Sequence, residues 1–479
     1  MNSTDSRHAT APDGPPPALR RSIGLLQATA LVVGIIIGAS IFVQPSEITR
    51  DVPSAAGIFM VWAAAGLLTT VGALICAELA AAYPESGGVY VFLRRTLSPA
   101  VGFLWGWAMF WSMHSGIIAA IAVIFARYLA WFVPGGDGWV KPMAVGAILL
   151  VSAVNYAGVQ HGSRLQTAFT IGKVAAIALM IAAGYAVAGA GAGGGGGAAT
   201  GAGAGGGISG AGAATGASPL GGVTLSAFVR AVGAGLFAFG GWHMVTYTAG
   251  ETVDAPRTIP RALVLGMGVV IVCYMALNAV YLHVLPLGVV MRSTRVAADA
   301  ANAVLGSGGA AFMSALVVFS CFGGIAGLVL AGPRVYHAMA EDGLLFRWAG
   351  AVHPTFRTPH RAIALQAVWS CVLVATGSYR VLFTRVVYTE WIFFALMAAG
   401  LLLARRRPTF RPPYRVRGGV VVPVLFIALA AAVVVNQVVT QPAESTFGLA
   451  LVLAGLPVYA VWTRRAHRLE ERRAHHRLP

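Results

Sequence analysis

The sequence predicts an all-α membrane protein with 12 transmembrane helices. Of the 479 residues, 57% are hydrophobic and only 10% are charged, and the mean hydropathy is +0.76. A soluble globular domain carries far more charge. Apolar segments of about 20 residues, the length that spans the hydrocarbon core of a bilayer, recur along the chain. Two of them are interrupted near their midpoints by small residues.

Short polar connections separate the apolar segments, and each segment is expected to form one membrane-spanning helix. Residues 1–22 are polar and rich in proline, and they lack the apolar region and cleavage site of a secretory signal. We therefore expect the first apolar segment to remain in the membrane. The segments cover residues 25–49, 55–82, 98–132, 141–158, 164–189, 223–250, 261–287, 310–340, 361–378, 382–404, 420–440 and 445–463.

The basic residues follow the positive-inside pattern of a membrane protein. When both chain ends are placed on one side of the membrane, 23 of the 33 lysines and arginines fall on that side and eight fall on the opposite side. Both termini are therefore predicted to be cytoplasmic, and the basic tail at residues 464–479 is expected near anionic membrane lipids. Because topology explains the net charge of +17, no nucleic-acid partner is predicted.

The four cysteines all lie inside apolar segments, where they behave as small hydrophobic residues. We expect no disulfide, no metal site and no cofactor. The sequence also places no nucleophile, carboxylate pair or metal cluster at a cavity, so an enzyme is not predicted.

Two of the apolar segments carry a break. The first has Gly38, Ala39 and Ser40 at its midpoint, and the second has Gly240 and Gly241. Small residues let a helix unwind, but exposed backbone N–H and C=O groups are costly in hydrocarbon unless a polar partner meets them. Interrupted segments in corresponding positions of two halves are the best sequence indication of a transporter's binding site.

Residues 23–463 are predicted to form one transporter domain. Its two halves, residues 23–189 and 223–404, hold five segments each. An extracellular linker at residues 190–222 joins them, and its glycine and alanine composition can neither bury a core nor hold a helix. Residues 405–463 add the last two helices.

Short motifs occur along the chain in a fixed order: Gly34–Phe42, Ala77–Leu79, Tyr83–Gly88, Phe237–Trp242, Pro256–Ala262, Gly332–Gly343 and His353–Pro359. This ordered set resembles the amino acid, polyamine and organocation (APC) transporter superfamily, and within it the L-type amino acid transporter-like branch. The likeness covers the chain from about Leu25 to Trp462, without the linker. It implies a five-plus-five inverted repeat in which helices 1 and 6 are unwound at the membrane midplane.

The resemblance also implies how a substrate binds. In that superfamily the α-carboxylate of an amino acid meets backbone N–H groups of the first break, here those around Gly38, Ala39 and Ser40. The α-amine meets carbonyl groups of both breaks, and helix ends of this kind suit both charges of a zwitterion. Ser40 departs from the glycine that the family usually has there. The expected amine acceptors are Ile36, Phe237 and Gly240.

Lys173 is one of only two lysines and lies about eight residues inside the fifth segment. It could extend to the cytoplasmic interface, although charges inside a membrane are usually functional. The resemblance implies the functional role, since Lys173 matches a lysine whose ammonium group takes the place of a sodium ion in related transporters and connects segments one, five and eight. That role predicts sodium-independent transport. Gly324 replaces the usual hydroxyl partner, which leaves Ser320 as the candidate.

Histidine and aromatic side chains give further candidates. His114 and His243 lie near the midplane and could contact a substrate side chain or sense pH, although a hydrogen-bonded structural histidine is the more common case. Phe237 is expected to gate the site. Phe239 and Trp242 are expected to form its walls, with ordinary packing as the alternative.

The expected substrate is a neutral amino acid, because no acidic side chain was identified near the middle of a segment that could face the cavity. We expect alternating access, by exchange or facilitated movement. Proton-coupled symport, a polyamine or organic-cation carrier and an amino acid-sensing membrane receptor remain alternatives. The loop at residues 134–139 has no cysteine, so the disulfide-linked glycoprotein partner of animal L-type transporters is not expected.

Overall fold

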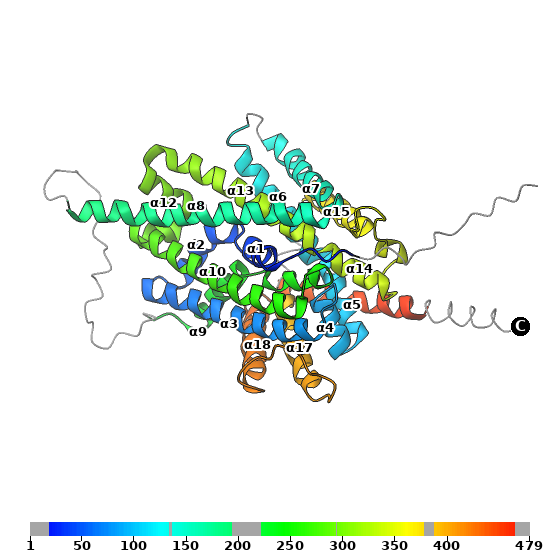
Figure 1. The fold of residues 1–479 in the computed structure, drawn as a ribbon. Helices are drawn as coiled ribbons and strands as arrows, with labels where there is room; N and C mark the ends of the chain where they lie inside the picture. The colour runs from blue at the N-terminus through cyan, green and yellow to red at the C-terminus, as the bar shows by residue number, and fades with distance from the viewer. Residues whose placement is uncertain (1–18, 134–136, 194–221, 294, 378–387, 465–479) are drawn as a thin grey trace, which may run out of the picture.

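The computed structural model describes residues 19–133, 137–193, 222–293, 295–377 and 388–464. Within these ranges the chain is a bundle of helices, and its only extended pairing is a single bridge between Ile23 and Thr252 (Figure 1). The predicted all-α class is confirmed. The two expected tails and the expected linker lie almost wholly outside the described residues.

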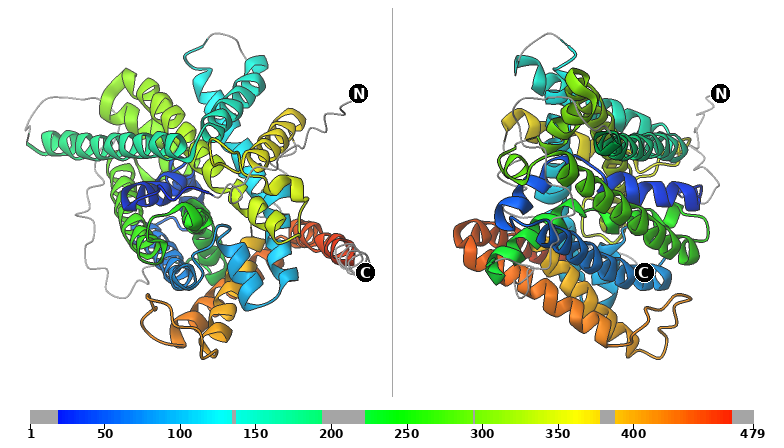
Figure 2. Two further views of the ribbon diagram at one scale, coloured as in Figure 1. Left: turned by 45° about the vertical axis from the view of Figure 1, so that its right-hand side comes forward. Right: turned by 90° about the vertical axis from the view of Figure 1, so that its left-hand side faces the viewer.

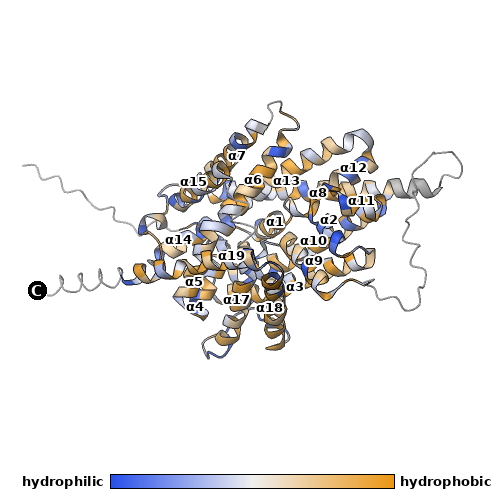
Figure 3. Cartoon of the chain, turned by 180° about the vertical axis from the view of Figure 1, so that it is seen from behind, coloured by the Kyte–Doolittle hydropathy of each residue, from blue (hydrophilic) through white to orange (hydrophobic). Residues whose placement is uncertain are grey.

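The helices follow the segments predicted from hydropathy. Eight helical stretches of the described chain are long and apolar enough to cross a membrane, and α1, α7 and α15 are shorter apolar helices. The count of 12 crossings therefore stays a prediction. Figure 3 shows apolar residues along most of the helix lengths. The elements are α1 Leu25–Ile36, η1 Ser40–Phe42, α2 Gln44–Asp51, α3 Ala55–Ala82, α4 Val89–Thr96, α5 Pro99–Ala108, η2 Met109–Met113, α6 His114–Leu129, η3 Asp137–Trp139, α7 Val140–Tyr156, α8 Val159–Gly193, α9 Leu225–Ala238, η5 Trp242–Glu251, α10 Ala255–Val284, α11 Leu287–Arg292, α12 Val296–Leu305, η6 Gly306–Gly308, α13 Gly309–Ala331, α14 Pro333–Glu341, η7 Arg347–Gly350, α15 His360–Thr376, α17 Thr389–Arg405, α18 Val421–Thr440 and α19 Pro442–Leu453.

Helix α1 lies inside the bundle, where it packs against α8, α10 and α13 (Figures 1 and 2). Its first turn is closed by Gln27, whose side-chain oxygen accepts the Gly24 N–H at 3.1 Å. Every residue from Ala30 to Ile36 is buried, as expected for a helix that is apolar around its whole circumference. The first break is thus held at the centre of the fold.

Three features were not predicted. Helix α8 continues to Gly193, so the expected start of the linker at residue 190 falls inside a helix. The connection after residue 287 contains the short helices α11 and α12, which are too short to cross a membrane and so gave no hydropathy signal. The third segment contains a π-helical turn at Met109–Met113; such turns are frequent at functional sites.

Candidate functional site

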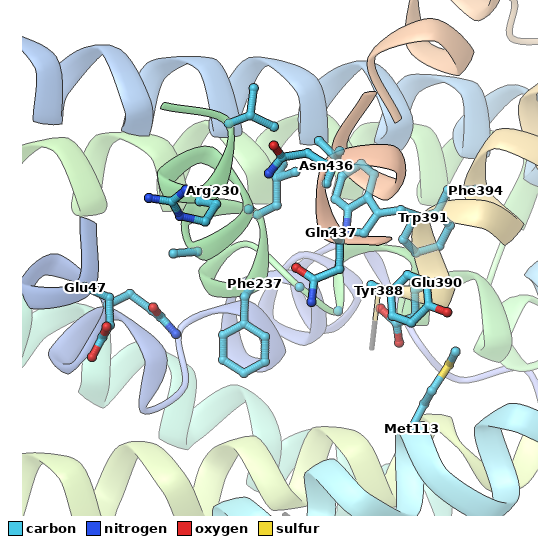
Figure 4. A pocket seen from close by; sticks show the side chains of 18 of the residues that line it. Glu47, Met113, Arg230, Phe237, Tyr388, Glu390, Trp391, Phe394, Asn436 and Gln437 are labelled. Atoms are coloured by element: carbon cyan, nitrogen blue, oxygen red, sulfur yellow. The ribbon is translucent and has the colours of Figure 1, made fainter. Parts of the chain in front are cut away.

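A cavity of about 460 Å³ lies among α2, α6, α9, η5, α17 and α18 (Figure 4). This volume is in the range of small-molecule sites. The side chains of Glu47 and Arg230 are 50% and 40% exposed, so the mouth lies where α2 ends and α9 begins. The lining includes Gln44, Glu47, Asp51, Met113, Ile117, Arg230, Phe237, Gly240, Gly241, Trp242, Met244, Tyr388, Glu390, Trp391, Phe394, Asn436 and Gln437.

The opposite end of the same helices is closed. Arg334 and Glu251 form a fully buried bidentate ion pair, with Nε–Oε2 at 2.6 Å and Nη2–Oε1 at 3.0 Å. The Ile23 N–H donates to the Glu251 carbonyl at 3.0 Å, and the Ile23 carbonyl accepts the Val253 N–H at 2.9 Å. The structure therefore has a cavity that is open on the α2 side and sealed on the Ile23 side.

The first break lies where it was predicted, between α1 and α2. The Ile36 carbonyl accepts the Gly38 N–H at 2.8 Å. The Tyr274 hydroxyl, from α10, lies 2.9 Å from that carbonyl and 3.0 Å from the carbonyl of Ala238. Tyr274 thus bridges the ends of α1 and α9, and the Ile36 carbonyl already has two donors.

The expected carboxylate donors differ in their availability. The Gly38 N–H is used within the break, whereas the N–H groups of Ala39 and Ser40 have no acceptor among the described residues. None of the three lines the cavity. In this conformation the first break therefore lies beside the cavity and is not part of its wall.

Lys173 is completely buried and lies against the first break. Its ammonium group donates to the carbonyls of Gly34 at 3.0 Å, Ile37 at 2.8 Å and Ser320 at 3.0 Å. The three N–H groups of the ammonium thus meet three backbone carbonyls, two at the end of α1 and one on α13. The Ser320 hydroxyl does not contact the lysine as expected; it donates to the Ile37 carbonyl at 3.2 Å.

The second break opens onto the cavity. Gly241 has φ of 95°, a left-handed conformation that favours glycine, and the chain continues as the 3₁₀ helix η5. A Cβ on Gly241 would come within 2.4 Å of Ile35, so the two breaks are in close contact. Gly240 also lines the cavity, and its carbonyl has no donor among the described residues.

The aromatic residues of the second break point in different directions. Phe237 and Trp242 line the cavity, and Figure 4 shows the Phe237 side chain. Phe239 does not, and its prediction as a wall is wrong. Its ring packs in the core against Trp62 and Tyr274, with ring centroids at 6.0 and 5.0 Å, because residues two apart at the end of a helix point in nearly opposite directions and Phe237 takes the cavity side.

Neither predicted histidine lines the cavity. His114 Nε2 lies 2.9 Å from the Leu328 carbonyl, while its Nδ1 has no partner within the described chain. His243 is enclosed by the rings of Trp105, Trp242, Tyr247 and Phe394, and both of its ring nitrogens lack a partner among the described residues. Both histidines are packing residues in this conformation.

Acidic side chains at helix ends, which the neutral-substrate prediction did not consider, do line the cavity. Glu390, in the first turn of α17, lines it together with Glu47 and Asp51. Glu47 pairs with Arg50 at 2.8 Å and Asp51 pairs with Arg230 at 2.9 Å. Glu390 has no hydrogen-bond or ion-pair partner among the described residues.

Sequence reasoning also missed Tyr274 and the cavity walls from α17 and α18. A signal for Glu390 was present, because it lies about eight residues inside the predicted tenth segment, as deep as Lys173 lies in the fifth. The rule that intramembrane charges are functional applied to both. No comparable signal separated Tyr274 from Tyr281, which lies in the same apolar helix.

Comparison with known proteins identifies the family. The profile of the amino acid permease family matches residues 23–459. The chain belongs to this family. Permeases and exchangers of amino acids are also among its individual relatives. It is 29% identical over 445 residues to the serine/threonine exchanger SteT of Bacillus subtilis, a match that covers 92% of this chain and 96% of that one.

Two animal relatives extend the comparison. The permease is 28% identical over 449 residues to the rabbit large neutral amino acids transporter small subunit 2, covering 92% of this chain and 80% of the relative. It is 27% identical over 471 residues to the human Asc-type amino acid transporter 1, covering 96% and 86%. The expected resemblance to amino acid transporters of the APC type is confirmed.

Proposed function

We propose that this permease carries neutral L-amino acids across the cell membrane by alternating access, through exchange or facilitated movement. The relatives described above are transporters or exchangers of amino acids by name. The observation that carries the proposal is the pair of adjacent breaks. They leave the N–H groups of Ala39 and Ser40 and the carbonyl of Gly240 without partners among the described residues.

These backbone groups match the two ends of a zwitterion. Free N–H groups suit the α-carboxylate, and free carbonyl groups suit the α-ammonium. The Gly240 carbonyl would accept the amine first. The Phe237 carbonyl, which already accepts the Gly240 N–H at 3.1 Å, would add a second interaction. The Ile36 carbonyl would become available only when Tyr274 moves away, since Gly38 and Tyr274 already donate to it.

Phe237 would act as the gate between the cavity and the first break, and Trp242 as a wall. After the substrate binds, the helices that carry the breaks would rock against the remaining helices, closing the mouth between α2 and α9 and opening the end sealed by Arg334 and Glu251. The sealed and open ends described above support this sequence of events.

Transport is proposed to be independent of sodium. The Lys173 ammonium supplies a positive charge beside the first break and satisfies the carbonyls of Gly34, Ile37 and Ser320. Three carbonyl oxygens around one point are also the kind of ligands that a hard cation prefers. An ammonium group that occupies this position leaves no room there for a sodium ion.

The permease is proposed to lie in the cell membrane with both termini in the cytoplasm, which makes the mouth of the cavity extracellular. The distribution of basic residues supports this orientation. We propose no catalytic activity. We also propose no disulfide-linked heavy chain, because all four cysteines lie inside apolar segments.

A thermal-shift screen of the purified protein against the twenty amino acids and putrescine tests the proposal, since a ligand of the native state raises the apparent melting temperature. Neutral amino acids should raise it, and putrescine should not, because it has no carboxylate. Uptake into sodium-free proteoliposomes should follow. Stabilisation by putrescine alone would favour the polyamine carrier, binding without uptake would favour a receptor, and uptake that requires a proton gradient would favour symport.

A further inference from the structure

One charged side chain of the cavity lacks a partner among the residues that the structure describes. Four charged residues line it: Glu47, Asp51, Arg230 and Glu390. The first three are in ion pairs at the mouth. Glu390 alone has no partner among the described residues.

The polar neighbours of Glu390 on the cavity wall have other partners. The hydroxyl of Tyr388, two residues away along the chain, donates to the Ser445 carbonyl at 2.5 Å. The Gln437 amide donates to the Gln441 side chain at 3.0 Å. Figure 4 shows these side chains around the cavity. No hydrogen bond joins either side chain to the Glu390 carboxylate within the described chain.

An unpaired carboxylate in a confined site is unfavourable, because it loses hydration without gaining a counter-charge. Two features reduce this cost for Glu390. It lies in the first turn of α17, where the helix dipole favours a negative charge, and it faces a cavity that water can enter. A bound cation would stabilise it further.

The surroundings of Glu390 suit the end of a basic side chain. Trp391 and Phe394 lie on the same helix and line the same cavity. Aromatic faces contact aliphatic carbons and also attract ammonium and guanidinium groups. Phe237, Gly240 and Gly241 of the second break line this cavity as well, so a substrate held at the break can extend its side chain towards Glu390.

We propose that Glu390 is a specificity-determining residue that binds the cationic end of a basic amino acid, so that the permease accepts basic as well as neutral amino acids. The inference rests on the proposed transport function and deepens it. The zwitterionic part of either substrate binds the breaks, and a basic side chain gains one additional charge-assisted hydrogen bond.

The test compares L-ornithine with L-norleucine, which differ by an ammonium group in place of a terminal methyl group. Competition against uptake of each labelled compound is measured in proteoliposomes. The wild-type protein should bind ornithine at least as tightly as norleucine. Glu390→Gln should lower the ornithine-to-norleucine affinity ratio by about tenfold or more, the loss expected for one charge-assisted hydrogen bond.

Glu47→Gln is the matched control, because it removes the same charge from the same cavity at a position already neutralised by Arg50. Its affinity ratio should change by less than about twofold, as for other exposed ion pairs. Equal shifts in the two variants would overturn the proposal, since they would indicate a general field effect. An unchanged ratio in Glu390→Gln, or equal loss of both substrates, would also overturn it.

The controls separate this inference from the proposed function. Norleucine uptake by Glu390→Gln shows that the variant is folded, and a thermal-shift titration with both compounds replaces uptake if transport is slow. Wild-type uptake of norleucine without recognition of ornithine would overturn the role of Glu390 and leave the proposed function intact. Uptake of neither compound would overturn both.

Discussion

Lys173 and Glu390 are both charged residues inside predicted apolar segments, but the protein surrounds them differently. The Lys173 ammonium is completely buried and meets three backbone carbonyls. The Glu390 carboxylate faces a cavity and meets no partner among the described residues. A satisfied charge of this kind holds the first break in its conformation, whereas an unsatisfied one indicates a ligand.

Replacing Lys173 by methionine should have the largest effect. The carbonyls of Gly34, Ile37 and Ser320 would lose their common donor, at a cost of about 3 kcal/mol or more in unfolding free energy. Transport should be lost, and the apparent melting temperature in detergent should fall. A variant as stable and active as the wild type would show that Lys173 does not hold the break.

Tyr274→Phe should have the next largest effect. It removes the hydroxyl that connects the Ile36 and Ala238 carbonyls, which should cost about 1–2 kcal/mol and loosen the two half-helices relative to each other. We expect a lower melting temperature and an altered transport rate. Tyr281→Phe is the control in the same helix, since the Tyr281 hydroxyl has no partner among the described residues; equal effects of the two variants would contradict the account.

Ser320→Ala should have a smaller effect. Lys173 contacts the backbone carbonyl of Ser320, which the substitution keeps, so only the hydrogen bond from the hydroxyl to the Ile37 carbonyl is lost. The expected loss is about 1 kcal/mol, with transport still independent of sodium. If Ser320→Ala made uptake sodium-dependent, the hydroxyl would have the coupling role that we propose for the lysine.

Glu390→Gln should have the smallest effect on stability. A melting temperature that does not fall distinguishes it from Lys173→Met. Removing a carboxylate that has no protein partner should leave the melting temperature without ligand unchanged or slightly raised. A clear decrease, measured by the same thermal assay, would mean that Glu390 stabilises the fold and would remove the contrast with Lys173.

Much of the fold could be predicted from the sequence because it depends on local composition. Hydropathy placed the helices, and small residues placed both breaks. The directions of side chains at the breaks could not be predicted. Phe237 and Phe239 are two residues apart and so point in nearly opposite directions at the end of α9, but only the folded structure shows that the Phe237 side faces the cavity.

The candidate site was predicted less completely for the same reason. Backbone groups of the breaks were accessible to sequence reasoning, but the walls from α17 and α18 depend on how the last helices pack against α9. Tyr274 bridges two chain ends that come together only in the folded protein. Glu390 is different, since its depth within an apolar segment was visible in the sequence.

The most direct test of the central claim is counterflow in sodium-free proteoliposomes loaded with an unlabelled neutral amino acid. The claim is that the two breaks hold an amino acid while Lys173 takes the position of a cation. The account predicts rapid accumulation of labelled substrate without sodium, and none in Lys173→Met vesicles. Counterflow that appears only when sodium is added to the wild-type protein would contradict it.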